Sequence, residues 1–64
     1  MSVRAWTASQ VRALRSRLRM TQREFAAKMG VSQVTLSAWE NDRQAIKLSN
    51  KARLDAVLRE AMRD

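Results

Sequence analysis

Neither cysteine nor histidine occurs among the 64 residues of this chain. A domain of about 60 residues buries only about 60% of the surface that its unfolded chain exposes, so its core is small. Disulfide bonds cannot compensate here, and the usual thiolate and imidazole ligands of zinc are missing. We therefore expect one domain over residues 1–64 with no metal and no cofactor. Its stability would come from well-capped, tightly packed helices and from burial of a surface in an oligomer.

Residues that interrupt helices are rare in this chain. It contains no proline and one glycine, whereas alanine, leucine, arginine, glutamine and methionine, which favour helices, are frequent. The sequence therefore predicts an all-α fold of four helices, or of five if a short turn is counted separately.

Capping signals mark where the helices begin. Thr7 is followed three residues later by Gln10, and Thr21 by Glu24, so both pairs match a capping box. Ser32 marks a third start, although Thr35 stands where the box requires Glu or Gln. Together with the apolar periodicity, these signals predict helices from Thr7 to about Arg19, from Gln22 to Met29, from about Gln33 to Asn41, and from Ser49 or Asn50 to about residue 63.

Apolar residues recur at helical spacing in all four segments, and they predict one shared core. The predicted core positions include Val11, Leu14, Leu18, Phe25, Ala26, Met29, Leu36, Trp39 and Leu54. Methionine and tryptophan at this spacing are more typical of a core than of a cofactor site.

The charge of the chain indicates a polyanionic partner. The chain has thirteen basic residues, ten of them arginine, and six acidic residues, so its net charge is +7. Arginine binds phosphates with its forked guanidinium group. A basic surface that only maintains solubility is the alternative. No signal-peptide-like or membrane-spanning run occurs, so we expect a cytoplasmic protein without membrane contact. An enzyme is not expected, because His, Cys, Tyr and a glycine-rich phosphate loop are all lacking.

The short linker between the second and third helices is typical of a helix-turn-helix over residues 22–41. Three residues, Gly30 to Ser32, are suited to a crossing of about 90–120°. Ala26 is small where the helices approach each other, and Gly30 tolerates a positive φ. Leu36 and Trp39 would anchor the second helix of the motif to the core.

The segment MTQREFAAKMGVSQ (residues 20–33), together with WEN (residues 39–41), resembles the phage-repressor and Cro family of XRE-like helix-turn-helix proteins. The resemblance covers about residues 11–43 and implies a compact repressor-like domain. The chain departs from the family pattern at Asp42, where glycine is frequent, and at Ile46, where proline is frequent.

The resemblance implies a DNA site on the exposed face of the third helix, opposite Leu36 and Trp39. Gln33 would pair with adenine N6 and N7, and Val34 would contact a thymine methyl. Ser37 and Ala38 would face base edges one turn further on. Contacts to phosphates are expected from Thr21, Gln22, Ser32, Thr35, Asn41, Arg43 and Lys47. The family also implies a structural salt bridge between Arg15 and Glu40.

The expected partner is double-stranded DNA that carries an inverted repeat, bound by a homodimer. We expect the dimer surface on the last helix, among Val57, Leu58, Ala61 and Met62, with complete packing of these residues into the core as the alternative. No small-molecule ligand is evident, which favours an autorepressor. A protein-binding adaptor or an antitoxin-like partner on the same scaffold stays open, and the sequence does not separate a phage repressor from an antitoxin or a controller protein. A membrane-surface peptide is disfavoured, because Val11 and Leu14 are expected in the core.

Overall fold

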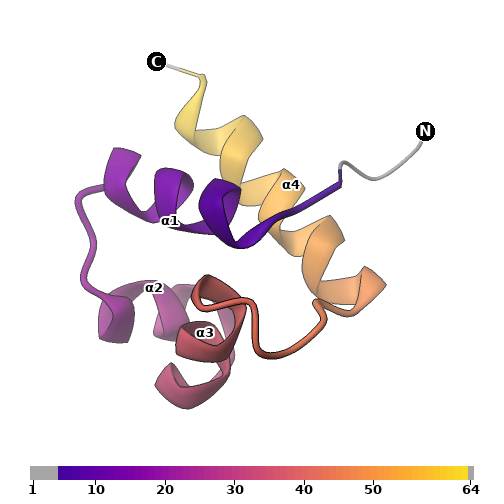
Figure 1. The fold of residues 1–64 in the computed structure, drawn as a ribbon. Helices are drawn as coiled ribbons and strands as arrows, with labels where there is room; N and C mark the ends of the chain where they lie inside the picture. The colour runs from indigo at the N-terminus through magenta and orange to yellow at the C-terminus, as the bar shows by residue number, and fades with distance from the viewer. Residues whose placement is uncertain (1–4, 64) are drawn as a thin grey trace.

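The computed structural model describes residues 5–63, and within this range it contains four helices and no strand. They are α1 (Ala8–Arg17), α2 (Gln22–Met29), α3 (Gln33–Glu40) and α4 (Leu48–Ala61), shown in Figure 1. The all-α fold predicted from the sequence is therefore confirmed.

Both predicted capping boxes are present. The Thr7 hydroxyl accepts from the Gln10 backbone N–H at 3.2 Å, and the Gln10 side chain accepts from the Thr7 N–H at 3.0 Å. At the start of α2 the corresponding distances between Thr21 and Glu24 are 3.1 and 2.8 Å. Each box satisfies backbone donors that a helix start leaves without partners, which explains why these two helices begin where the sequence indicates.

Several helix boundaries differ from the prediction, among them the end of α4, which lies at Ala61 and not at about residue 63. α1 ends at Arg17, because Arg19 adopts a left-handed conformation with φ of 56°. α3 ends at Glu40, and Asp42, at the position where the family often has glycine, also has a φ of 56°. α4 begins at Leu48, and its N-cap residue, Lys47, makes no side-chain capping bond. That start therefore carried no capping signal in the sequence.

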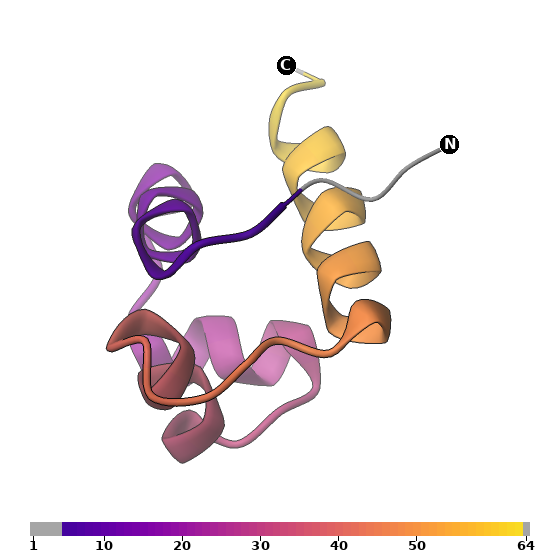
Figure 2. The same ribbon diagram turned by 45° about the vertical axis from the view of Figure 1, so that its right-hand side comes forward.

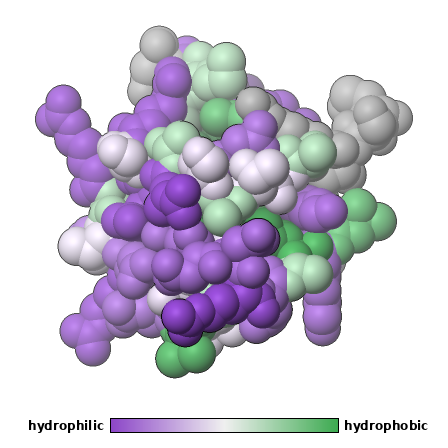
Figure 3. All heavy atoms as spheres, in the orientation of Figure 1, coloured by the Kyte–Doolittle hydropathy of each residue, from purple (hydrophilic) through white to green (hydrophobic). Residues whose placement is uncertain are grey.

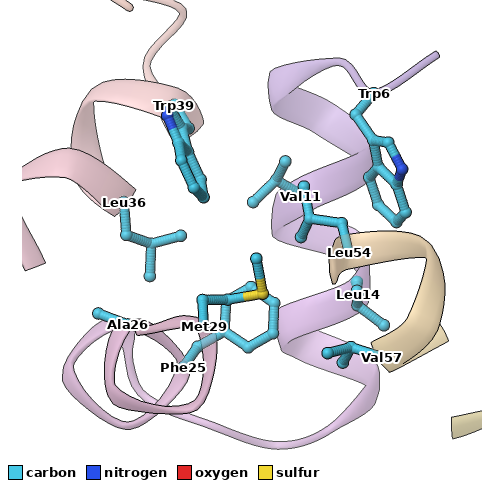
Figure 4. Packing of buried hydrophobic residues seen from close by; sticks show 10 residues of the cluster. All are labelled: Trp6, Val11, Leu14, Phe25, Ala26, Met29, Leu36, Trp39, Leu54 and Val57. Carbon is cyan, nitrogen blue, oxygen red and sulfur yellow. The ribbon is translucent and has the colours of Figure 1, made fainter. Parts of the chain in front are cut away.

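The core is formed by side chains from all four helices and from the segment before α1 (Figure 4). Trp6 belongs to it at 8% exposure, and its Nε1 donates to Asp55 of α4 at 2.8 Å, so the N-terminal segment is fixed to the last helix. The buried apolar residues are Trp6, Val11, Leu14, Phe25, Ala26, Met29, Leu36, Trp39, Leu54 and Val57.

The arrangement of the helices leaves α3 at one end of the molecule. Gly30, with φ of 71°, ends α2 in the left-handed region and lets the chain turn directly into α3. In both Figure 1 and Figure 2 the C-terminal end of α4 lies at the top, whereas α3 lies at the bottom. The C-terminal end of α4 and α3 are thus at opposite ends of a particle of 29 × 25 × 19 Å.

Candidate nucleic-acid interface

One face of α3 is buried and the other is open to solvent. Leu36 is fully buried and Trp39 is 2% exposed, so these two side chains fix how the helix is rotated. Val34, two positions before Leu36, therefore lies on the opposite side of the helix and points outward. Val34 is accordingly 80% exposed, although it is a large apolar residue.

The outward face of α3 borders a shallow depression. All four residues expected to read bases lie along it, and two of the residues expected to bind phosphate complete its border. The lining residues are Gln22, Gln33, Val34, Ser37, Ala38 and Arg43. The turn between α2 and α3 therefore brings side chains from α2, α3 and the segment after α3 together on one open surface.

The position of α3 is fixed by a buried carboxylate at its last residue. Glu40 is 2% exposed, and Arg15 of α1 donates to it twice, from Nε to Oε2 at 2.7 Å and from Nη2 to Oε1 at 3.1 Å. This is the pair for which the family resemblance implied a salt bridge. The hydrogen bond to Glu40 raises the pKa of Arg15 above its ordinary value, although burial acts in the opposite direction. The guanidinium group is therefore charged at any physiological pH.

Gln22 belongs to the same cluster. Its side-chain Nε2 donates to Glu40 Oε1 at 3.1 Å, so the first residue of α2 is linked to the last residue of α3. An amide nitrogen carries two N–H donors, and this contact uses one of them. The residue expected to bind a phosphate thus also holds the two helices of the motif together.

Arg12 is a member of the cluster that the sequence analysis did not identify. Its Nη1 donates to the main-chain carbonyl of Glu40, at the C-terminal end of α3, where a cation is favoured by the helix dipole. The available signal was its position three residues before Arg15, which places both arginines on one face of α1. With this contact, α1 binds both the side chain and the backbone of Glu40.

Residues 11–62 match a protein-family model described as helix-turn-helix. The chain belongs to this family. The model is of the XRE type, so the resemblance inferred from the sequence is confirmed, and the protein is a DNA-binding regulator of that type. The family is one of DNA-binding regulators and not of enzymes. Comparisons with curated proteins and with solved structures give no match.

The expected phosphate-binding residues of this helix-turn-helix surround α3, and several of them also cap helices. Thr21 caps α2, and Ser32 caps α3 by accepting from the Thr35 N–H at 3.1 Å. Asn41 closes the other end of α3, because its Nδ2 donates to the carbonyl of Ser37 at 2.8 Å. Thr21, Ser32 and Asn41 remain exposed, so a capping bond does not remove them from the surface. Arg43 and Lys47 are exposed in the segment between α3 and α4.

The four residues expected to form a dimer surface do not lie in equivalent environments. Val57 is 5% exposed and belongs to the core, so its assignment to an interface was wrong. It faces inward because it lies one turn after Leu54 on the side of α4 that contacts α1 and α2. Leu58 and Ala61 are partly buried against the core, whereas Met62 is 62% exposed.

The part of the chain that the structure describes contains no group of three or more acidic side chains placed to hold a metal ion. None of its four helices is long and apolar enough to cross a membrane.

Proposed function

We propose that this regulator binds an inverted repeat in double-stranded DNA as a homodimer and represses transcription, including that of its own gene. The observation that supports this best is the depression along α3, because four outward residues of one anchored helix border it together with Gln22 and Arg43. The outward face of α3 can enter a major groove, whose width accepts a single α-helix.

Within this proposal, Gln33 reads adenine. It is exposed at the first position of α3, and its amide can donate to and accept from the adenine edge at the same time. Val34 contacts a thymine methyl. This contact would explain why an apolar side chain is exposed at this position. Ser37 and Ala38, one turn further along, face the next base edges.

The polar residues around α3 position the helix without reading sequence. Backbone N–H groups at the start of α2, next to Thr21 and Gln22, face one phosphate, because a helix N-terminus attracts anions. Ser32 and Thr35 meet the groove edge at the start of α3. Asn41, Arg43 and Lys47 follow the backbone of one strand beyond its end.

Dimeric binding follows from the size of the reading surface. One helix contacts only about four or five base pairs, which selects too few sites in a genome, so two copies on half-sites about one helical turn apart are needed. We further infer that protein concentration, and not a bound effector, regulates its activity. The protein would then act in the cytoplasm, where its DNA lies.

Selection of bound duplexes from a random pool, at two salt concentrations, tests the proposal. We expect an inverted repeat with half-sites about 10 base pairs apart. Gln33→Ala should keep the repeat and relax one position per half-site, by about 5- to 150-fold in discrimination, which is the contribution of a good bidentate pair.

The matched control is Gln44→Ala, which removes an exposed glutamine from the segment between α3 and α4. It should leave every base preference unchanged. Binding that shows no base preference, disappears at the higher salt concentration and ignores Gln33→Ala would instead support a protein-binding adaptor on the same scaffold.

A further inference from the structure

Three large apolar side chains are strongly exposed within residues 5–63. Val34 is 80%, Leu48 69% and Met62 62% exposed. Val34 lies on the face of α3 that the proposed function uses. Leu48 and Met62 lie at the two ends of α4, as its first residue and its C-cap, and neither contributes to the reading surface.

Leu48 is part of a small apolar patch, which we call the α4-start patch and define as Ala45, Ile46 and Leu48. Ala45 and Leu48 are exposed, and Ile46 is partly buried because it packs against the core. Figure 3 shows hydrophobic atoms gathered at the right-hand edge of the molecule, where the segment after α3 enters α4 in Figure 1.

We propose that a second copy of this chain docks on the α4-start patch about a twofold axis, and that it does so on DNA and not in free solution. This inference rests on the proposed function, since it identifies the surface that joins the two half-site readers. Its first support is position. Only the segment 41–47 separates α3 from α4, and Arg43 in that segment borders the depression along α3.

The patch is therefore beside the reading surface and at the same end of the molecule. Two copies that meet there can turn both α3 helices toward one side of a duplex, as a symmetric dimer on an inverted repeat requires. A dimer that pairs through Met62 would have a different arrangement of its two α3 helices. The C-terminal end of α4 lies opposite α3 in both ribbon views, so such a dimer would carry its two α3 helices at its outer ends.

The size and the surroundings of the patch argue that DNA is needed for pairing. A stable interface takes about 20–30 residues from each partner, whereas this patch offers three apolar side chains. Arg43, Lys47 and Lys51 flank it, and each copy has a net charge of +7. Two free copies therefore repel each other there, and the phosphates of a shared duplex remove that repulsion.

The test compares Leu48→Glu with Met62→Glu, which make the same change in charge at the two ends of one helix. Both sites are exposed, so both variants should fold. The helix dipole favours a glutamate in the first turn of α4 and slightly disfavours one at the C-cap. The probes are two duplexes, one with the inverted repeat recovered by selection and one with a single half-site, and binding is followed by fluorescence anisotropy.

For the wild-type protein we expect the second half-site to be filled at least about tenfold more tightly than the first. Leu48→Glu should abolish this cooperativity, and Met62→Glu should retain it. Because Leu48→Glu adds a negative charge next to Lys47, it should bind the single half-site less tightly than Met62→Glu, so cooperativity is measured within each variant as the ratio of its affinities for the second and the first half-site. Sedimentation of the free wild-type protein at about 100 μM should show a monomer.

Other results overturn the inference in distinguishable ways. Cooperativity lost in Met62→Glu and retained in Leu48→Glu would place the dimer surface at the far end of α4 and leave the proposed function intact. A stable dimer without DNA would contradict the dependence on DNA. Independent filling of the two half-sites would reject both this inference and the homodimer of the proposed function, while half-site reading by Gln33 would stand.

Discussion

Arg15 of α1 binds both carboxylate oxygens of Glu40, the last residue of α3, at 2.7 and 3.1 Å. Its Nη1 also donates to the carbonyl of Met20, just before α2, at 3.2 Å. One guanidinium group outside the helix-turn-helix thus contacts the segment that leads into the motif and the last residue of its second helix. The orientation of α3 relative to α1 and α2 therefore depends on Arg15, a residue outside the helix-turn-helix.

Arg15→Ala should lower the free energy of unfolding by about 2–3 kcal/mol, less than the full cost of breaking a buried pair because the Arg15 side chain is 26% exposed. The change leaves the buried carboxylate of Glu40 with Gln22 as its remaining side-chain partner, and breaking one side of a buried pair commonly costs about 3–5 kcal/mol. Urea denaturation followed by circular dichroism measures the difference. The control is Arg17→Ala, which removes an exposed arginine from the same helix. Equal effects of the two changes would show that the ion pair contributes little.

The two threonine caps offer a second, paired prediction. Thr7 and Thr21 make the same capping box, at the starts of α1 and α2, so Thr7→Ala and Thr21→Ala should each cost about 1 kcal/mol of stability. Only Thr21 lies at the expected phosphate contact. In a titration of the selected duplex, Thr21→Ala should weaken binding and Thr7→Ala should not. Equal affinities of the two variants for DNA would limit Thr21 to its capping role.

Local signals explain why much of this fold could be predicted from the sequence. A capping box is a contact between residues three apart, and the starts of α1, α2 and α3 were found from Thr7, Thr21 and Ser32. The start of α4 was misplaced by one or two residues, because Lys47 makes no side-chain capping bond. The left-handed conformations of Arg19 and Asp42 depend on how the chain must turn between packed helices. The residue types at these two positions do not predict them.

Contacts between distant residues were harder to predict. The bond from Arg12 to the carbonyl of Glu40 joins residues 28 positions apart, and it follows only once α1 and α3 are packed together. Periodicity identified the apolar face of α4, but not how far around that helix the core extends. Val57 was therefore assigned to an interface although it is buried, and Leu48, at the other end of the helix, was not considered.

Salt dependence should separate the phosphate contacts from the rest of the basic surface. If Arg43 neutralises one phosphate, Arg43→Ala should reduce the slope of log affinity against log salt concentration by about 1. The measurement is anisotropy on the selected duplex at four or five salt concentrations. Arg63→Ala removes an exposed arginine at the far end of α4 and should leave the slope unchanged. The assignment of Arg43 fails if both variants keep the wild-type slope.

Val34 gives the most specific prediction about sequence reading. At 80% exposure it contributes little to the core, so Val34→Ala should leave the free energy of unfolding almost unchanged. If Val34 contacts a thymine methyl, replacing that thymine with deoxyuridine should weaken wild-type binding about fourfold, which corresponds to the about 0.8 kcal/mol for one buried CH₂ group. Val34→Ala should bind the thymine and deoxyuridine duplexes equally well. The same base change in the flanking DNA serves as the control, because it should affect neither protein. A fourfold loss that persists in Val34→Ala would assign the methyl contact to another residue on the outward face of α3.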